Sequence, residues 1–148
     1  MRHGDAQPYS NFNNDFNRPL SKVGEFESKK MGAYAGKIFQ PDIVISSSAK
    51  RAHLTANIAV ESGKWDCPII LERRIYGGPP KLLIDLINKQ NDKFSSIFLV
   101  GHEPNFSRFV IETTCSSHIH FPTAAIAKID FEVLSFSLIE FNIGTLDW

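Results

Sequence analysis

The chain has 148 residues, of which 43% are hydrophobic and 22% are charged. This size and composition fit one globular domain with an apolar core and exclude a chain that is disordered throughout. Sixteen basic residues balance sixteen acidic ones, so no excess positive charge indicates a nucleic-acid partner. Cys67 and Cys115 match no zinc or disulfide pattern, and no apolar run predicts a membrane span or signal peptide. We therefore expect a cytoplasmic protein without a membrane partner.

Helix and strand patterns alternate after a long loop that extends from Gly4 to Pro19. Ser21 is placed to cap a helix that continues to about Phe39, with Val23, Phe26, Tyr34 and Ile38 on its apolar face. Strands are then predicted over residues 43–45, 68–71 and 96–100, helices over 51–61, 79–89 and 104–113, and closing strands over 124–129 and 135–141.

This alternation predicts a single α/β domain over residues 1–148, built on a mainly parallel sheet. In such folds the ligand binds to the loops that follow the carboxyl ends of the strands. The polar groups expected near these ends are residues 2–4, Arg18, residues 46–51 and residues 101–102.

The tripeptide Arg2-His3-Gly4 combines a guanidinium group with an imidazole. Arginine clamps phosphate oxygens through paired hydrogen bonds. A neutral histidine can attack phosphorus through one ring nitrogen when an acceptor holds the N–H of the other. Gly4 has no side chain, so it permits a sharp turn beside the bound group. The tripeptide alone is a short motif and supports only a hypothesis of phosphate chemistry.

Three more residues have a functional and a purely structural interpretation. Arg51 opens a helix, where anions bind favourably, although a surface arginine is common. His102 follows the strand over 96–100 and precedes a helix, so it either donates to a phosphoryl oxygen or caps a loop. Arg18 either folds over the site or is solvated. His118 and His120 lack a third ligand, so we expect no metal site.

Together these motifs resemble the histidine phosphatase superfamily, and within it the SixA-type phosphohistidine phosphatases. The resemblance extends over nearly the whole chain. It rests on the residues Arg2-His3-Gly4-Asp5-Ala6, Arg18-Pro19-Leu20-Ser21, the stretch 46–56, Val100-Gly101-His102-Glu103-Pro104, and Phe121-Pro122-Thr123-Ala124-Ala125.

The resemblance implies a three-layer α/β/α fold of the phosphoglycerate mutase type. It implies that His3 is the nucleophile and that His102 is the second histidine of the site. Arg2 and Arg51 would bind the phosphoryl oxygens, with Arg18 and Gly4 as further phosphate-binding candidates. No metal or other cofactor is implied, since positioned cations can stabilise the charge of a transferring phosphoryl group.

Three departures from the family pattern stand out. Ser48 stands where relatives usually have proline, and residues 72–78 offer no certain acidic proton donor. Only Met1 precedes the Arg-His-Gly motif, which in the family ends a central strand, so we expect that strand to be largely missing from this chain and the native start to lie upstream. A missing donor favours a phosphoramidate substrate, because imidazole leaves more readily than an alkoxide.

These features predict hydrolysis of protein phosphohistidine, for example on a phosphotransfer domain, through a phosphohistidine intermediate on His3. One alternative is a small-molecule phosphomonoesterase that uses Asp5 or Glu72 as its proton donor. Another is a phosphate-binding module without catalytic activity.

Overall fold

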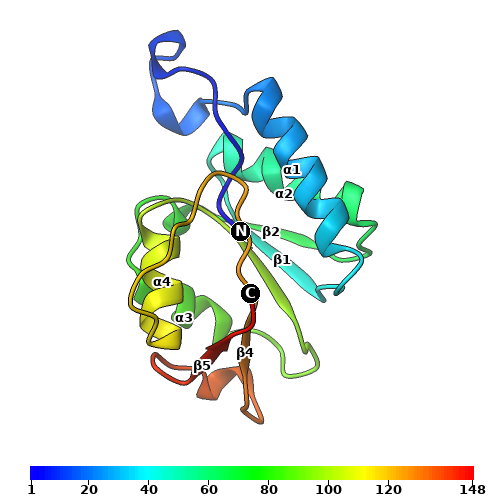
Figure 1. Cartoon of the computed structure of the whole chain (residues 1–148), viewed down its shortest axis with the longest axis vertical. Coiled ribbons are helices and arrows are strands. Elements are labelled where there is room, and N and C mark those ends of the chain that lie inside the picture. Colours follow the sequence, from blue (N-terminus) through cyan, green and yellow to red (C-terminus); the bar gives the residue numbers. More distant parts are fainter.

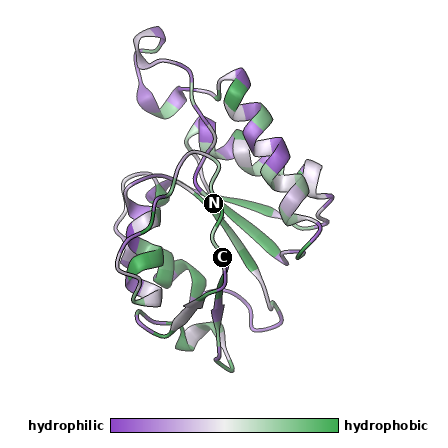
Figure 2. Ribbon diagram, viewed as in Figure 1, coloured by the Kyte–Doolittle hydropathy of each residue, from purple (hydrophilic) through white to green (hydrophobic).

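The computed structural model describes all residues from Met1 to Trp148. Its centre is a parallel sheet in the order β2-β1-β3, formed by Ile69–Glu72, Ile43–Ser47 and Ile97–Val100. All five residues of the central strand β1 are buried. A parallel strand covered on both faces is a continuous apolar run, and Figure 2 shows the three strands coloured as hydrophobic.

Helices cover both faces of this sheet, with α1 (Lys22–Ala35) and α2 (Lys50–Gly63) on one side and α3 (Pro80–Ile87) and α4 (Asn105–Thr114) on the other (Figure 1). Alternate residues of β1 contact different layers: Val44 belongs to the core cluster beneath α2, whereas Ile43 and Ile45 belong to the cluster beneath α3 and α4. The predicted three-layer α/β fold is therefore confirmed. No helix has the length and apolar character needed to cross a membrane.

The buried face of α1 differs from the prediction. Ser21 does cap the helix, since its hydroxyl accepts a hydrogen bond from Gly24 N, but the large side chains expected in the core are exposed, with Val23 at 58% and Phe26 at 69%. The residues that face inward are small: Gly24, Ser28, Gly32 and Ala35. A Cβ on Gly32 would lie 2.6 Å from the Ala59 Cα, so α1 approaches α2 too closely for large side chains.

The C-terminal region also departs from the prediction. Its two strands are β4 (Ile129–Phe131) and β5 (Gly144–Leu146), which pair antiparallel. The strand expected over residues 135–141 is wrong, because that segment contains a 3₁₀ turn over Phe136–Leu138. The Ser135 hydroxyl accepts a hydrogen bond from Ser137 N, and such local bonds favour turns over strands.

The first residues of the chain lie beside β3. Arg2 forms a parallel bridge with Gly101, and His3 N donates to Gly101 O at 3.0 Å. Only Met1 to His3 occupy this strand position.

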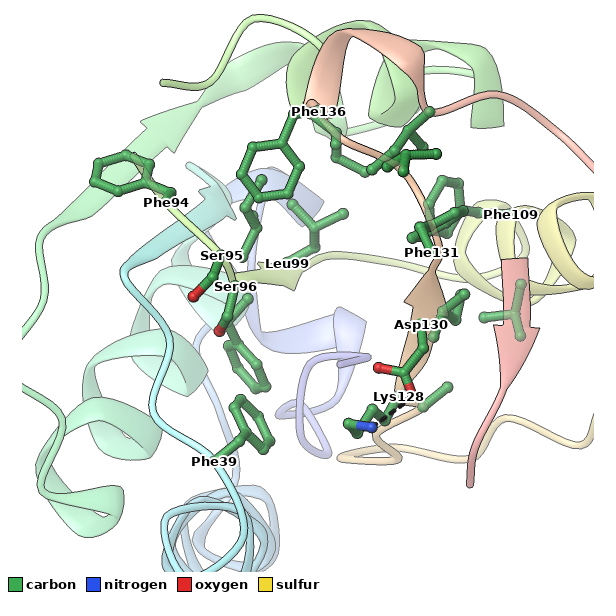
Figure 3. A pocket seen from close by; sticks show the side chains of 18 of the residues that line it. Phe39, Phe94, Ser95, Ser96, Leu99, Phe109, Lys128, Asp130, Phe131 and Phe136 are labelled. Atoms are coloured by element: carbon green, nitrogen blue, oxygen red, sulfur yellow. Dashed lines mark hydrogen bonds and ion pairs between the residues drawn. The ribbon is translucent and has the colours of Figure 1, made fainter. Parts of the chain in front are cut away.

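Next to them an apolar cleft of about 510 Å³ follows the outer edge of β3. Figure 3 shows its aromatic lining, which includes Phe39, Phe94, Phe109, Phe131 and Phe136.

The long loop is ordered and closed at its base. Gln7 N donates to Pro19 O at 3.1 Å, and Ala6 bridges to Leu20. Between these contacts the chain forms two short 3₁₀ turns, Tyr9–Asn11 and Asp15–Asn17. The second turn places Asp15 against the start of α2, at the carboxyl end of the sheet.

Candidate phosphate-binding site

Three residues singled out from the sequence meet at the carboxyl end of the sheet. His3 follows the segment beside β3, Arg51 lies in the first turn of α2 directly after β1, and His102 follows β3. All three are buried. The two imidazole centroids are 5.0 Å apart, and Arg51 Nε donates to His3 Nε2 at 3.2 Å. The loops after neighbouring parallel strands therefore converge on one small polar site.

His3 is held in the tautomer that a nucleophile needs. Its Nδ1 lies 2.7 Å from the Gly4 carbonyl oxygen, so Nδ1 carries the proton and Nε2 presents a lone pair toward Arg51. The pKa of His3 is lowered to about 4, mainly by burial; the bond to Gly4 opposes this lowering, and the nearby positive charge of Arg51 adds to it. At neutral pH the imidazole is therefore uncharged and available for attack.

His102 is held by the hydroxyl of Ser47, the last residue of β1. Its Nε2 lies 2.8 Å from the Ser47 hydroxyl oxygen, while its Nδ1 is buried and has no hydrogen-bond partner. The pKa of His102 is lowered to about 3, mainly by burial and in smaller part by His3 and Arg51. The Tyr76 ring packs edge-on against it at 5.3 Å. A buried nitrogen without a partner beside a nucleophile is suited to a polar ligand.

Arg51 links the nucleophile to the long loop. Its Nη1 donates to the Asp15 carbonyl at 2.7 Å, and its Nη2 donates to Asp15 Oδ2 at 2.8 Å. The Tyr76 hydroxyl donates to the same Oδ2 at 2.8 Å. Burial acts to raise the pKa of Asp15, but the bond from Tyr76 and the charge of Arg51 outweigh it and keep that pKa below its usual value. The carboxylate is thus ionised.

The other predicted phosphate ligands lie around this centre. Arg18 Nε donates to Asp15 Oδ1 at 3.0 Å, so Arg18 contacts the site through Asp15. Arg2 Nη1 donates to the Phe121 carbonyl, while its buried Nε has no partner. Gly4 N donates to Thr55 Oγ1 at 3.0 Å, and a Cβ there would meet Gly24 O at 2.5 Å. The glycine thus permits close approach to α1.

An open cleft of about 480 Å³ lies over this centre. Its lining residues are Asp15, Arg51, Tyr76, Gly77, His102, Glu103, Pro104 and Asn105. The two carboxylates suggested as proton donors, Asp5 and Glu72, are not among them. Glu72 binds Arg74 through both carboxylate oxygens, and these bonds hold its pKa at about 2, which makes it a poor acid.

The two histidines weighed above as metal ligands lie outside the site. His118 and His120 are exposed in the loop between α4 and β4. No group of three or more His, Cys, Asp or Glu side chains is placed to hold a metal ion. The serine found in place of the family's proline, Ser48, does not prevent α2 from beginning at Lys50.

Sequence reasoning missed two residues of the site, Asp15 and Tyr76, and included Ser47 only within the stretch 46–51, without a role of its own. Ser47 lies inside a motif that was singled out, and its place at the end of β1 could have marked it. Asp15 and Tyr76 lie in irregular segments, far from each other in sequence. Only the folded loop brings the Asp15 carboxylate to the Tyr76 hydroxyl.

The chain is similar in sequence to a known protein. The chain is 32% identical over 113 residues to an uncharacterised protein of Mycobacterium tuberculosis, Rv1276c, which covers 75% of this chain and 68% of that protein. No protein-family model matches the chain.

Solved structures match over the whole chain. A SixA phosphatase from Nakamurella multipartitia has a TM-score of 0.87 and 19% identity, with coverage of 100% of this chain and 91% of that one. The protein histidine phosphatase SixA complexed with tungstate has a TM-score of 0.83 and 25% identity, covering 100% and 92%. The mycobacterial glucosyl-3-phosphoglycerate phosphatase Rv2419c has a TM-score of 0.73 and 14% identity, covering 99% and 95%. With its motifs and its fold in agreement, the chain belongs to the histidine phosphatase superfamily.

Proposed function

We propose that this phosphatase hydrolyses phosphohistidine on a protein, such as a phosphotransfer domain, through a phosphohistidine intermediate on His3. The observation that carries the proposal is the buried, neutral His3, whose Nδ1 is bonded to Gly4 O and whose Nε2 faces the Arg51 guanidinium. A neutral imidazole beside a phosphate-binding cation is suited to phosphoryl transfer to nitrogen, and the Nε2 lone pair becomes available when Arg51 Nε passes its hydrogen bond from His3 to the phosphoryl group.

In the first step, the His3 Nε2 lone pair forms a bond to phosphorus while the bond from phosphorus to the leaving nitrogen breaks. Arg51 stabilises the negative charge on the phosphoryl oxygens, and the free Nε of Arg2 supplies a second donor. The unpartnered Nδ1 of His102 contacts the same group. In the second step, water attacks phosphorus, inorganic phosphate leaves, and the lone pair returns to His3.

The reaction as proposed uses no metal ion, because the charge compensation comes from arginine side chains. A cytoplasmic location, and a single domain over residues 1–148, remain predictions from the sequence. Activity on small phosphate esters is the second candidate. The cleft has two carboxylates of its own, Asp15 and Glu103, but the ion pair with Arg51 keeps Asp15 ionised and unable to donate a proton.

The test is a paired assay in the presence of a chelator. One substrate is a phosphohistidine-bearing phosphotransfer domain, and the other is p-nitrophenyl phosphate, each measured with the wild-type protein and with His3→Asn. We expect fast loss of phosphohistidine, slow ester hydrolysis, and no turnover by the variant. Equal rates on both substrates favour the phosphomonoesterase. Phosphate binding without turnover favours the non-catalytic module.

A further inference from the structure

Asp15 places a negative charge inside a site built for an anion. Its Oδ2 accepts from Arg51 Nη2 and from the Tyr76 hydroxyl, both at 2.8 Å, and its Oδ1 accepts from Arg18 Nε at 3.0 Å. Oδ1 has one accepted bond, so a lone pair remains free. The side chain is 29% exposed and lines the cleft, so a ligand in the cleft can reach it.

A carboxylate at this position carries an electrostatic cost. It repels the oxygens of a phosphoryl group and it takes up hydrogen bonds of Arg51 that the phosphoryl group would otherwise receive. That cost is offset when Asp15 holds Arg51 in place, or when the substrate itself brings a positive charge to the carboxylate. These two roles predict different substrate preferences.

We propose that Asp15 is a specificity-determining residue that pairs with the protonated imidazole ring of a phosphohistidine substrate. This inference rests on the proposed function, because it names the leaving group that the same site selects. The hydrogen bonds of Arg51 support this proposal. Arg51 Nε donates to His3 Nε2 at 3.2 Å, and Arg51 Nη2 donates to Asp15 Oδ2 at 2.8 Å. A phosphoryl group held by that guanidinium has the nucleophile on one side and the carboxylate on the other.

The bond changes balance without a proton donor. As His3 Nε2 bonds to phosphorus, the electron pair of the breaking P–N bond returns to the leaving ring and neutralises its positive charge. The proton on the distal ring nitrogen stays there, hydrogen-bonded to Asp15. An alcohol leaving group must instead gain a proton, and the ionised Asp15, whose pKa is held low by Tyr76 and Arg51, does not supply one.

The inference is tested with Asp15→Asn and two small probes, phosphoimidazole and p-nitrophenyl phosphate. The nitrophenolate leaves without protonation, so its release does not use the carboxylate. We expect kcat/KM for phosphoimidazole to fall about 10–100-fold, the effect of losing one hydrogen bond to a charged group. We expect kcat/KM for p-nitrophenyl phosphate to stay within about threefold of wild type or to rise.

Glu112→Gln is the matched control, because Glu112 also accepts a hydrogen bond from an arginine, Arg108 Nη2 at 3.4 Å, but does not line the cleft. It should leave the ratio of the two kcat/KM values unchanged. Asp15→Ser repeats the charge removal in case the asparagine variant folds poorly. An equal loss on both probes, or no loss on phosphoimidazole, overturns the inference and leaves Asp15 as a support for Arg51. A wild-type protein that cleaves neither probe and also leaves a phosphohistidine-bearing phosphotransfer domain intact overturns the proposed function, and this inference with it.

Discussion

The floor and the mouth of the cleft are built in different ways. The floor is the name used here for His3, Arg51 and His102, which are buried at strand ends and at the start of α2. Arg51 and His102 line the cleft, and His3 accepts a hydrogen bond from Arg51. The mouth is the name used here for Asp15 and Tyr76, which line the cleft, and for Arg18, which donates to Asp15. These three residues are partly exposed and come from irregular segments. Burial keeps both floor histidines neutral, whereas ion pairing keeps the Asp15 carboxylate charged. The difference suggests that the floor performs the phosphoryl transfer and the mouth selects the leaving group.

The largest effect should come from the nucleophile. In His3→Asn, the side chain retains a hydrogen-bonding group but has no imidazole to accept phosphorus. We expect kcat to fall by at least about 1000-fold, measured by release of inorganic phosphate from a phosphohistidine protein. A variant that retains more than a tenth of wild-type activity would contradict the assignment of the floor.

Arg51 joins the two regions, so its loss should damage both. We expect Arg51→Gln to lower kcat/KM about 100–1000-fold, as for the loss of one donor to a developing charge. Inhibition by tungstate should weaken in parallel, because the same guanidinium would bind that oxyanion. Lys37→Gln removes a positive charge elsewhere on the chain and should change neither value.

Between pH 7 and pH 4.5, acid should destabilise the protein through the floor and not through the mouth, because the pKa of Asp15 is held below its usual value. His3 has a pKa of about 4 in the native state, against about 6.5 when unfolded. Between these values the unfolded chain binds more protons, so stability falls as the pH is lowered from about 6.5 to about 4. We expect this site alone to shift the unfolding equilibrium about 100-fold at pH 4.5.

Urea unfolding at pH 7 and pH 4.5 measures that shift, and His3→Asn should show a smaller difference between the two pH values. A wild-type midpoint that is unchanged at pH 4.5 would show that His3 is not buried and neutral. Tyr76→Phe, a change in the mouth, should retain the wild-type dependence.

A smaller effect is expected at Ser47, whose hydroxyl fixes His102 at 2.8 Å. Ser47→Ala should lower kcat about 2–10-fold, as expected for one neutral hydrogen bond, without changing KM. Rescue by Ser47→Thr, which restores the hydroxyl, distinguishes positioning of His102 from a packing defect. No rescue with equal loss of stability would favour the packing defect.

Two floor residues, Arg51 and His102, could be predicted from the sequence because they lie at fixed offsets from strands and helices with clear patterns, whereas the prediction of His3 rests on the Arg2-His3-Gly4 motif and the family resemblance. His102 follows the apolar strand Ile97–Val100, and Arg51 opens α2 after β1. The mouth could not, because the contact of Asp15 with Tyr76 joins residues 61 positions apart and depends on the path of an irregular loop.

Helix α1 shows a second limit of the sequence pattern. Its large apolar residues suggested the core face, but the close approach to α2 at Gly32 leaves room only for small side chains. The 3₁₀ turn over Phe136–Leu138 is a third case, in which a local serine bond replaces the expected strand. In both cases a tertiary or local contact determines the structure against the hydrophobic periodicity of the sequence.

The central claim, that His3 carries the phosphoryl group, is tested most directly by trapping the intermediate. The protein is mixed with phosphoimidazole, quenched in alkali to preserve phosphohistidine, digested, and mapped by mass spectrometry. The account predicts one added phosphoryl group on the peptide that contains His3, at single-turnover rates that match turnover, and none in His3→Asn. A phosphoryl group on His102 instead, or steady turnover without any phosphorylated peptide, would contradict it.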